Sequence, residues 1–389
     1  MDSIYLDHNA TAPLLPQIVE VMAACDRDGP ANPASQHAAG RRARQMLEQA
    51  REGIAEILGV DLHSSQPDQL IFTSGGTEAN NLALFGLAGE TPNRVIISAI
   101  EHPSVVGPAE ALARCGWQVD RLRVSSDGVI DVEHARNLLR PAPRAPRPSL
   151  LSAMLANNET GVMQPVGELA RLCAEQNIPL HTDAVQVAGK LPLRFRDLGA
   201  SAMTITAHKF HGPRGIGALV VRHGVKLQPL LHGGFQQAGL RPGTEDVALA
   251  IGMFTALKLW QREADERATR MTILRDRLEA QFLAGDAYAV ISGASAPRLP
   301  HTTNVAFVGI NRQALLMALD LAGVACSTGS ACASGSSEPS PVLLAMGCDE
   351  GVVEGALRLS LGAMTTLAEI DEAARRILLA VNELRRRQN

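Results

Sequence analysis

The feature that most constrains the fold is a series of short apolar runs separated by amphipathic stretches. The runs lie at residues 69–73, 94–98, 149–156, 178–182 and 202–206. Strands that are apolar on both faces and alternate with helices are typical of a mostly parallel sheet with helices on both sides. A further run at 217–222 closely follows the last one and predicts a hairpin partner for it. The sequence therefore predicts an α/β fold.

Helical patterns lie between and after these runs. Apolar residues at helical spacing predict a helix over 38–58, with Gly59 at its C-cap, and a second helix over 165–177. We expect one long charged helix over 257–284. The capping-box pattern Thr366-Leu-Ala-Glu369 predicts the start of a final helix.

Chain length and the change of pattern after about residue 255 predict two domains. The 389 residues exceed one typical domain and suffice for two. We expect a large domain with the parallel sheet over 15–255. A smaller α/β domain would be formed by 1–14 and 256–389.

The charge balance and the N-terminus narrow the classes of function. There are 36 Lys and Arg against 40 Asp and Glu, so no excess of positive charge attracts nucleic acid or an acidic membrane surface. No apolar run approaches the roughly 18 residues that span a bilayer. The first residues lack a basic patch followed by an apolar stretch, so we expect no secretory signal and a cytoplasmic protein.

The cysteines are scattered along the chain, at positions 25, 115, 173, 326, 332 and 348. Without an export signal we expect no disulfide framework, and because no Cys/His group has zinc-ligand spacing we expect no metal. Cys115 and Cys173 lie inside apolar helical patterns and are predicted to be small buried hydrophobic residues.

Candidate site residues gather where the predicted strands end, the edge at which open α/β sheets bind ligands. They are Gly76, Thr77, His102, Asn158, Asp183, Gln186, Thr206, His208 and Lys209. Glycines between a strand and a helix can cradle a phosphate or simply form a tight turn. Asp183 could hold a proton on a pyridine nitrogen or cap a helix, and His102 could stack on a ring or be structural. Together they describe a site for a phosphate, an aromatic ring and an amine.

The amine has only four candidates, because the chain contains four lysines. Lys209 follows an apolar strand, where burial lowers the pKa of a lysine and makes its amine available as a nucleophile or base. Lys190, Lys226 and Lys258 lie in turns or on a charged helix and are predicted to be solvated.

A second group of candidates lies towards the C-terminus. Cys332 belongs to a Gly/Ser-rich run, a flexible arm that could carry a nucleophilic thiol. Cys326 follows an apolar stretch and is expected to be more buried. Arg358 interrupts an alternating apolar strand, so it either points to water or forms a fork that grips a carboxylate.

Several motifs occur in order along the chain, among them Tyr5-Leu-Asp-His-Asn-Ala-Thr11, Thr73-Ser-Gly-Gly-Thr-Glu78, Glu101-His102, Asn157-Asn-Glu-Thr-Gly161, His181-Thr-Asp-Ala-Val-Gln186, Ala207-His-Lys209, Arg241-Pro-Gly-Thr244, the loop ending in Ser-Ala-Cys332, and Arg358-Leu-Ser-Leu-Gly362. With them the chain resembles, essentially end to end, the cysteine desulfurases of the class V aminotransferase group, the type that serves nitrogenase and general iron–sulfur cluster assembly. The resemblance implies the pyridoxal-phosphate transferase fold of type I, a homodimer, L-cysteine as substrate and a protein sulfur acceptor, either a scaffold or a carrier.

The resemblance also implies a role for each matching residue. Lys209 would bind pyridoxal 5'-phosphate covalently and move the Cα proton, Asp183 would pair with the pyridine nitrogen, and His102 would stack on the ring. Gln186 and Asn158 would bond the phenolic oxygen. The implied phosphate ligands are Gly76, Thr77, Thr206, His208 and, from a second subunit, Thr244. The implied substrate ligands are Arg358, Asn32 and Asn158. Cys332 would attack the substrate sulfur, which leaves an enzyme persulfide and alanine.

The chain departs from the family pattern at Ala12 and Phe235, where Thr and Gly are usual, and in a longer proline-rich stretch at 140–148. None of these departures removes a catalytic group. A selenocysteine lyase or a true aminotransferase on the same fold stays an alternative, and transamination would not need Cys332. A protein that senses metal or redox state through Cys326, Cys332 and Cys348 is another, but it would leave Lys209 and Asp183 unexplained.

Overall fold

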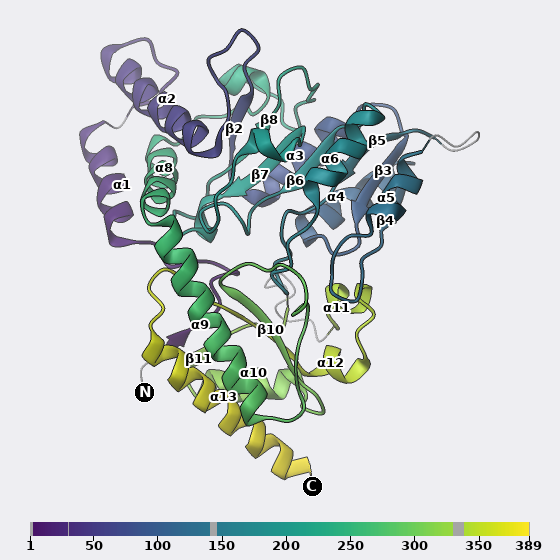
Figure 1. Cartoon of the computed structure of the whole chain (residues 1–389). Coiled ribbons are helices and arrows are strands. Elements are labelled where there is room, and N and C mark those ends of the chain that lie inside the picture. The colour runs from purple at the N-terminus through teal and green to yellow at the C-terminus, as the bar shows by residue number, and fades with distance from the viewer. Residues whose placement is uncertain (1–2, 30, 141–145, 330–337, 389) are drawn as a thin grey trace.

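The computed structural model describes residues 3–29, 31–140, 146–329 and 338–388, and its main element is a seven-stranded sheet (Figure 1). The strand order is β2-β8-β7-β6-β5-β3-β4. The strands are β2 (Gln69–Thr73), β3 (Arg94–Ser98), β4 (Gln118–Leu122), β5 (Pro148–Ser152), β6 (Leu180–Asp183), β7 (Ala202–Thr206) and β8 (Gly217–Val221). Only β8 runs antiparallel to its neighbours β7 and β2. The mostly parallel sheet and the hairpin partner are confirmed.

Helices cover both faces of this sheet because its strands are apolar on both sides. Leu70 and Phe72 of β2 share a buried cluster with Leu47 of α2, whereas Ile71, between them, packs with Leu82 of α3 on the other face. The helices of this part are α1 (Pro16–Asp28), α2 (Ala38–Leu58), α3 (Gly76–Ala88), α4 (Pro103–Arg114), α5 (Val132–Leu139), α6 (Val166–Glu175), α7 (Phe195–Leu198) and α8 (Val247–Arg262), with the short 3₁₀ helices η1 (Ala207–Lys209) and η2 (Gln236–Gly239).

The rest of the chain builds a smaller assembly in the lower half of Figure 1. Its antiparallel sheet has the order β12-β10-β9, and the N-terminal strand β1 pairs in parallel with β11. The elements are β1 (Ile4–Tyr5), α9 (Ala264–Gly285), β9 (Ala289–Ile291), β10 (Thr302–Phe307), α10 (Arg312–Leu321), β11 (Val324–Ala325), α11 (Pro341–Ala345), α12 (Glu350–Gly355), β12 (Ala356–Ser360) and α13 (Leu367–Gln388). The division into domains near residues 15 and 255 stays a prediction.

Helix ends follow the local sequence signals. Gly59 caps α2 with φ of 63°, a left-handed conformation that glycine adopts without strain. At the start of α13, Thr366 Oγ1 accepts a hydrogen bond from the N–H of Glu369 at 3.2 Å, and Glu369 Oε2 accepts one from the N–H of Thr366 at 2.8 Å. This reciprocal pair is the predicted capping box.

Two expectations from the sequence are wrong. The helix predicted over 257–284 is divided between α8 and α9, because Glu263 has φ of −122° and ψ of 15°, outside the helical region. Cys115 is exposed because it lies at the C-cap of α4, beyond the apolar face of that helix, whereas Cys173 is buried as predicted.

Helices α9 and α13 are the long helices of the smaller part, with 22 residues each. An apolar stripe that includes Ile370, Ala374 and Ile377 of α13 is buried in one cluster with Leu278 and Phe282 of α9. Within the described residues, no helix is long and apolar enough to cross a membrane.

The contact between β8 and the start of α3 generates a testable prediction. A Cβ added at Gly217 would lie 2.7 Å from the backbone carbon of Gly75 and 2.8 Å from the carbonyl oxygen of Ile205. Because backbone must move to relieve this overlap, we expect Gly217→Ala to lower the free energy of unfolding by about 1–3 kcal/mol in urea titrations. Gly167→Ala in α6, where the added Cβ meets nothing within 4 Å, should leave it unchanged or slightly higher. Equal stability of the two variants would contradict the prediction.

Candidate active site

The predicted strand-end residues converge on one cavity of about 270 Å³. Its walls come from the segments that follow β5, β6 and β7, from the first turns of α3 and α4, and from β12. Ten predicted residues line it: Gly76, Thr77, His102, Asn158, Asp183, Gln186, Thr206, His208, Lys209 and Arg358. Arg358 is 1% exposed, so of the two sequence alternatives for this residue the structure selects the one that points inward.

One end of the cavity is suited to an anion. Helix α3 starts at Gly76 and Thr77 there, and the first N–H groups of a helix have no partner within the helix. A Cβ at Gly76 would lie 3.2 Å from Val185 Cγ2, so glycine lets the chain pass close to the segment after β6. Thr206 and His208 line the same cavity from the end of β7. The arrangement can hold a phosphate, which is one of the two sequence alternatives for these glycines, and that role stays a prediction.

A buried carboxylate, Asp183, lines the same cavity. Its Oδ1 accepts a hydrogen bond from the N–H of Val185 at 2.9 Å, and its Oδ2 accepts one from Asn80 Nδ2 at 2.7 Å. Burial raises the pKa of Asp183, while the hydrogen bonds and the nearby Lys209 lower it. A buried carboxylate held by two donors can pair with a protonated ring nitrogen.

Asn80 also links Asp183 to His102. Its Nδ2 donates to Ser104 Oγ at 2.8 Å, and Ser104 Oγ lies 2.7 Å from His102 Nδ1. Burial, followed by the charges of Lys209 and Arg358, lowers the pKa of His102 to about 4, so its imidazole is neutral at pH 7. The sequence analysis missed Asn80 and Ser104. The available signal was helical spacing, because Asn80 lies one turn after Gly76 on α3.

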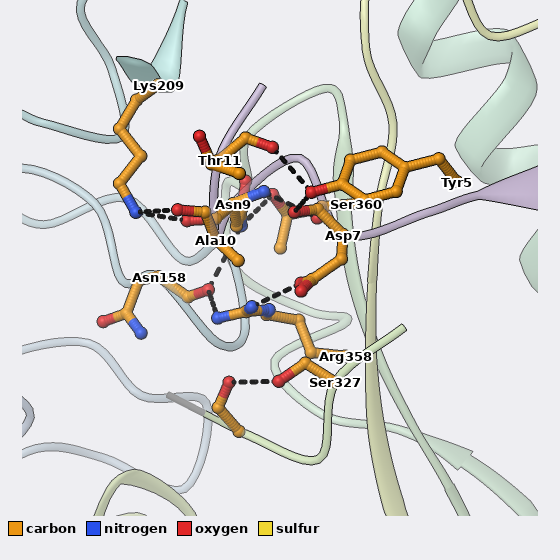
Figure 2. A network of polar contacts seen from close by, with 12 residues as sticks. Tyr5, Asp7, Asn9, Ala10, Thr11, Asn158, Lys209, Ser327, Arg358 and Ser360 are labelled. Atoms are coloured by element: carbon orange, nitrogen blue, oxygen red, sulfur yellow. Dashed lines mark hydrogen bonds and ion pairs between the residues drawn. The ribbon is translucent and has the colours of Figure 1, made fainter. Parts of the chain in front are cut away.

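The amine of Lys209 enters the cavity beside the N-terminal segment (Figure 2). Its Nζ donates to the carbonyl oxygens of Asn9 and Ala10 at 2.6 and 2.9 Å. Gln186 Nε2 donates to the same Asn9 oxygen at 3.1 Å, and Asn9 Nδ2 donates to the carbonyl of Asn158 at 3.1 Å. Asn9 is 1% exposed and was not among the predicted site residues. It lies within the first quoted motif, but no strand-end pattern marks it.

Lys190 is buried, which overturns the expectation that it is solvated, whereas Lys226 and Lys258 are exposed as predicted. Its Nζ donates to Gln186 Oε1 at 2.8 Å. Burial, followed by the charges of Lys209 and Arg358, lowers its pKa well below the usual value. Lys190 lies four residues after Gln186, and the turn after β6 folds so that its side chain contacts Gln186 in the wall of the cavity. The composition of the turn did not indicate this placement. Lys190 fixes the amide of Gln186 with its oxygen turned away from Asn9.

Three predicted residues lie elsewhere. Thr244 is exposed and lines a separate hollow of about 180 Å³ with Phe72 and Arg241. Asn32 lies on an exposed loop, where its Oδ1 accepts from the N–H of Ala34 at 2.9 Å. Cys332 lies outside the described residues.

A second cavity of about 690 Å³ adjoins the first, and Asn158 lines both. Cys326 lines this cavity and is half-buried. The burial of its thiol, followed by the charge of Asp7, raises the pKa of the thiol to about 12. The expectation that Cys326 is more buried than Cys332 stays a prediction, because Cys332 lies outside the described residues.

The contents of the first cavity define a class of protein. An anion cradle at a helix N-terminus, a buried carboxylate, a neutral imidazole and a lysine amine at the carboxyl edge of a mostly parallel sheet fit pyridoxal 5'-phosphate, with its phosphate, ring nitrogen and aldehyde. The side chains and helix N-terminus that line the cavity match the chemical groups of the cofactor in kind. The fold and the site are therefore those of a pyridoxal-phosphate enzyme of fold type I.

Comparison with known proteins identifies the family. The class V aminotransferase model matches residues 4–373. An IscS-like cysteine desulfurase of Mycobacterium tuberculosis is 41% identical, with 98% of this chain and 97% of the relative covered, and the cysteine desulfurase NifS of Azotobacter vinelandii is 38% identical, with 99% and 94% covered. The crystal structure of a NifS-like protein from Rickettsia africae superposes with a TM-score of 0.88 at 30% identity, covering 98% of this chain and 99% of that one. The chain belongs to the class V aminotransferase family and, within it, to the cysteine desulfurases.

The buried histidines predict how stability changes with pH. In the folded chain pKa values are lowered to about 3 or 4, largely by burial, for His8, His102, His181, His208 and His211. Below the ordinary value of about 6.5 the unfolded chain therefore binds more protons than the folded chain, and stability falls as the pH falls. Each imidazole contributes about 1.4 kcal/mol per pH unit. Glu101, whose pKa burial raises to about 8, opposes this by one proton.

We expect the free energy of unfolding of the cofactor-free protein to drop by several kcal/mol between pH 6.5 and pH 5, because the five imidazoles outweigh Glu101. Urea titrations at fixed ionic strength would measure it. A constant free energy of unfolding across that interval would show that the imidazoles are accessible to protons in the folded chain.

Proposed function

We propose that the protein is a pyridoxal-phosphate-dependent cysteine desulfurase that converts L-cysteine to L-alanine and leaves the sulfur on Cys332 as a persulfide. The relatives named cysteine desulfurase support the reaction, and the convergence of Lys209, Asp183 and Arg358 on one cavity carries it. The C–S bond of the substrate breaks and an S–S bond to Cys332 forms, so the sulfur is oxidised and the substrate carbon is reduced. One of the two thiol protons joins that carbon with the electron pair of the broken bond and completes alanine, and the other stays with the persulfide. The balance needs no external oxidant or reductant.

When bound, pyridoxal phosphate withdraws electrons from the Cα of the amino acid attached to it. The residues of the first cavity would hold it in place: Gly76, Thr77, Thr206 and His208 bind the phosphate, Asp183 the ring nitrogen, and Gln186 with Asn158 the phenolic oxygen. His102, neutral at pH 7, would stack on the ring. Lys209 would bind the cofactor covalently and would move the proton at Cα. The carbonyl oxygens of Asn9 and Ala10 accept hydrogen bonds from its amine and fix the position of the amine at the cavity.

The substrate would bind between the two cavities. Arg358 would take its carboxylate with Asn158, which lines both cavities. Asn32 stays a proposed further contact. The side chain of the substrate would then face the larger cavity. Part of its wall is formed by residues 326–329 and, further along the chain, by residues 338–341. Cys332 belongs to the sequence between these two parts of the wall, which supports its role as the attacking thiol.

A persulfide on a cysteine is a carrier, and the proposed function includes its delivery to a protein acceptor, either a scaffold or a carrier in iron–sulfur cluster assembly or another sulfur pathway. Two relatives carry the names IscS-like and NifS, which are linked to that assembly, and this supports such an acceptor. We place the reaction in the cytoplasm, where thiols are kept reduced and a transferable persulfide can be renewed.

The first test combines two variants with one assay. We expect Lys209→Met to lose the covalent link to pyridoxal phosphate, because the other buried amine, Lys190, is engaged with Gln186. Borohydride reduction and peptide mapping of the wild type should label Lys209. Cys332→Ser should keep the visible absorbance of the cofactor and lose at least 100-fold in sulfide release, because it removes only the nucleophile. Release of sulfide and alanine from L-cysteine, with reductant, is the measurement.

Cys326→Ser is the matched control and should retain most of the activity, because its thiolate is strongly disfavoured. A label on Lys190, or full desulfurase activity of Cys332→Ser, would overturn the assigned roles. Alanine without sulfide would indicate transamination instead.

We also propose that the enzyme is a homodimer in which Thr244 completes the phosphate site of the partner subunit. Thr244 lies outside the cavity of its own chain, which supports this proposal. The segment before it exposes three large apolar residues, Leu230, Leu231 and Phe235, the last of them 96% exposed. Apolar side chains exposed together in this way mark an interaction surface.

The dimer leads to a concentration-dependent prediction. Thr244→Ala should weaken the binding of pyridoxal phosphate several-fold without changing the sedimentation coefficient of the dimer, because it removes one hydroxyl donor. Phe235→Ser should shift the protein towards monomer and weaken cofactor binding in parallel. A cofactor-saturated, active monomer in sedimentation velocity would contradict the proposal.

A further inference from the structure

Asp7 and Arg358 form an ion pair at the boundary between the two cavities (Figure 2). Arg358 Nη2 donates to Asp7 Oδ1 at 2.6 Å. Arg358 lines the smaller cavity, which fits the cofactor, while Asp7 lines the larger one, from which the proposed substrate and thiol approach. The pair therefore stands where the substrate carboxylate would be recognised.

The guanidinium of Arg358 is only partly engaged. Its Nη1 reaches the carbonyl oxygen of Asn158 at a long 3.4 Å, and its buried Nε has no hydrogen-bond partner among the described residues. A buried donor without an acceptor is costly, so the Nε–H is suited to an incoming oxygen ligand. Within the part of the chain that the structure describes, Nη2 alone has a short bond to a side chain.

The backbone holds Asp7 in a fixed relation to Arg358. Asp7 forms a parallel bridge with Ser360, two residues beyond Arg358 on β12. The carbonyl oxygen of Asp7 accepts from Tyr5 Oη at 3.2 Å and from the N–H of Ala10 at 3.0 Å. The carboxylate and the guanidinium are thus both fixed to β12. The carboxylate can therefore orient the guanidinium, because its own position is set by the backbone.

We propose that Asp7 is a positioning residue for substrate recognition: it holds Arg358 through Nη2 and leaves the remaining donors of the guanidinium to the carboxylate of the amino-acid substrate. The inference rests on the proposed desulfurase function. A guanidinium held at one corner loses less conformational entropy when a carboxylate binds, which favours binding. Without Asp7 the long side chain would have to be ordered by the substrate itself.

A double-mutant cycle in the complete holoenzyme tests the proposal. Asp7→Ala should raise the KM for L-cysteine at least tenfold with a smaller change in kcat, and the visible absorbance of the cofactor should stay unchanged. In the Arg358→Gln background the same change should cause no further loss in kcat/KM, or a gain, because it then removes a carboxylate that has no cation beside it. An equal loss in both backgrounds would assign Asp7 a role independent of Arg358 and overturn the proposal.

Three further variants sharpen this result. Asp7→Asn keeps an oxygen acceptor for Nη2 and should bring KM within about threefold of the wild type; a loss as large as that of Asp7→Ala would overturn the positioning role. Asp7→Ser replaces Asp7→Ala in the cycle if the alanine protein does not fold. Asp371→Ala breaks an exposed pair with Arg277 and should leave KM unchanged.

The two proposals fail separately. A wild type that releases neither sulfide nor alanine refutes the desulfurase function. An active wild type whose cycle is additive refutes only the role of Asp7.

Discussion

The site depends on the buried amide of Asn9, which ties the N-terminal segment to both parts of the chain. Its side chain is hydrogen-bonded to three groups, the carbonyl of Asn158, His301 and Thr302 Oγ1. Its backbone carbonyl accepts from Lys209 and Gln186. Any displacement of this segment would leave several buried polar groups without partners, so the hydrogen bonds specify one arrangement. The position of the amine relative to β12 is therefore set by a turn at residues 8–10 that belongs to neither sheet.

The electrostatics of the first cavity follow from the way that the hydrogen bonds of Asn9 hold these segments together. Lys209 and Arg358 line the first cavity and Lys190 contacts Gln186 in its wall, while the carboxylate among the described residues of that wall is Asp183. The second cavity is lined by Asp7 and four glutamates. The positive charges act on each other and lower the pKa of Lys190, in addition to the effect of burial. Charge interactions are stronger where water is excluded. The first cavity therefore favours anions, which is the common property of a phosphate group and an amino-acid carboxylate, and ligand binding should stabilise the fold.

The sequence predicted what depends on local pattern. Continuous apolar runs predicted the parallel sheet, and their ends predicted nine of the residues that line the cavity, while Arg358 was predicted from its place in an alternating apolar strand. It did not predict Lys190, because a lysine in a turn is solvated unless the turn folds back under a site. Asn9 and Asp7 were quoted only within a motif, since their contacts join residues about 150 to 350 positions apart in the chain. Thr244 was expected in the site on resemblance alone, and in the single chain it lies elsewhere. Such long-range contacts leave no periodic signal.

The two cysteines that lie on either side of residue 330 show why the proposed nucleophile has to be placed on an arm. Cys326 follows β11 directly and is held in the wall of the larger cavity, close enough to Asp7 for its charge to act on the thiol. With a pKa of about 12, the thiolate fraction of Cys326 at pH 7 is on the order of 10⁻⁵, far too small for a nucleophile that must attack sulfur. Burial is the larger cause of this raised pKa, and the charge of Asp7, the carboxylate proposed to position Arg358, adds to it. A reactive thiol has to reach the site from outside this wall and withdraw again with its sulfur, and the Gly/Ser-rich sequence around Cys332 has the composition for such a movement.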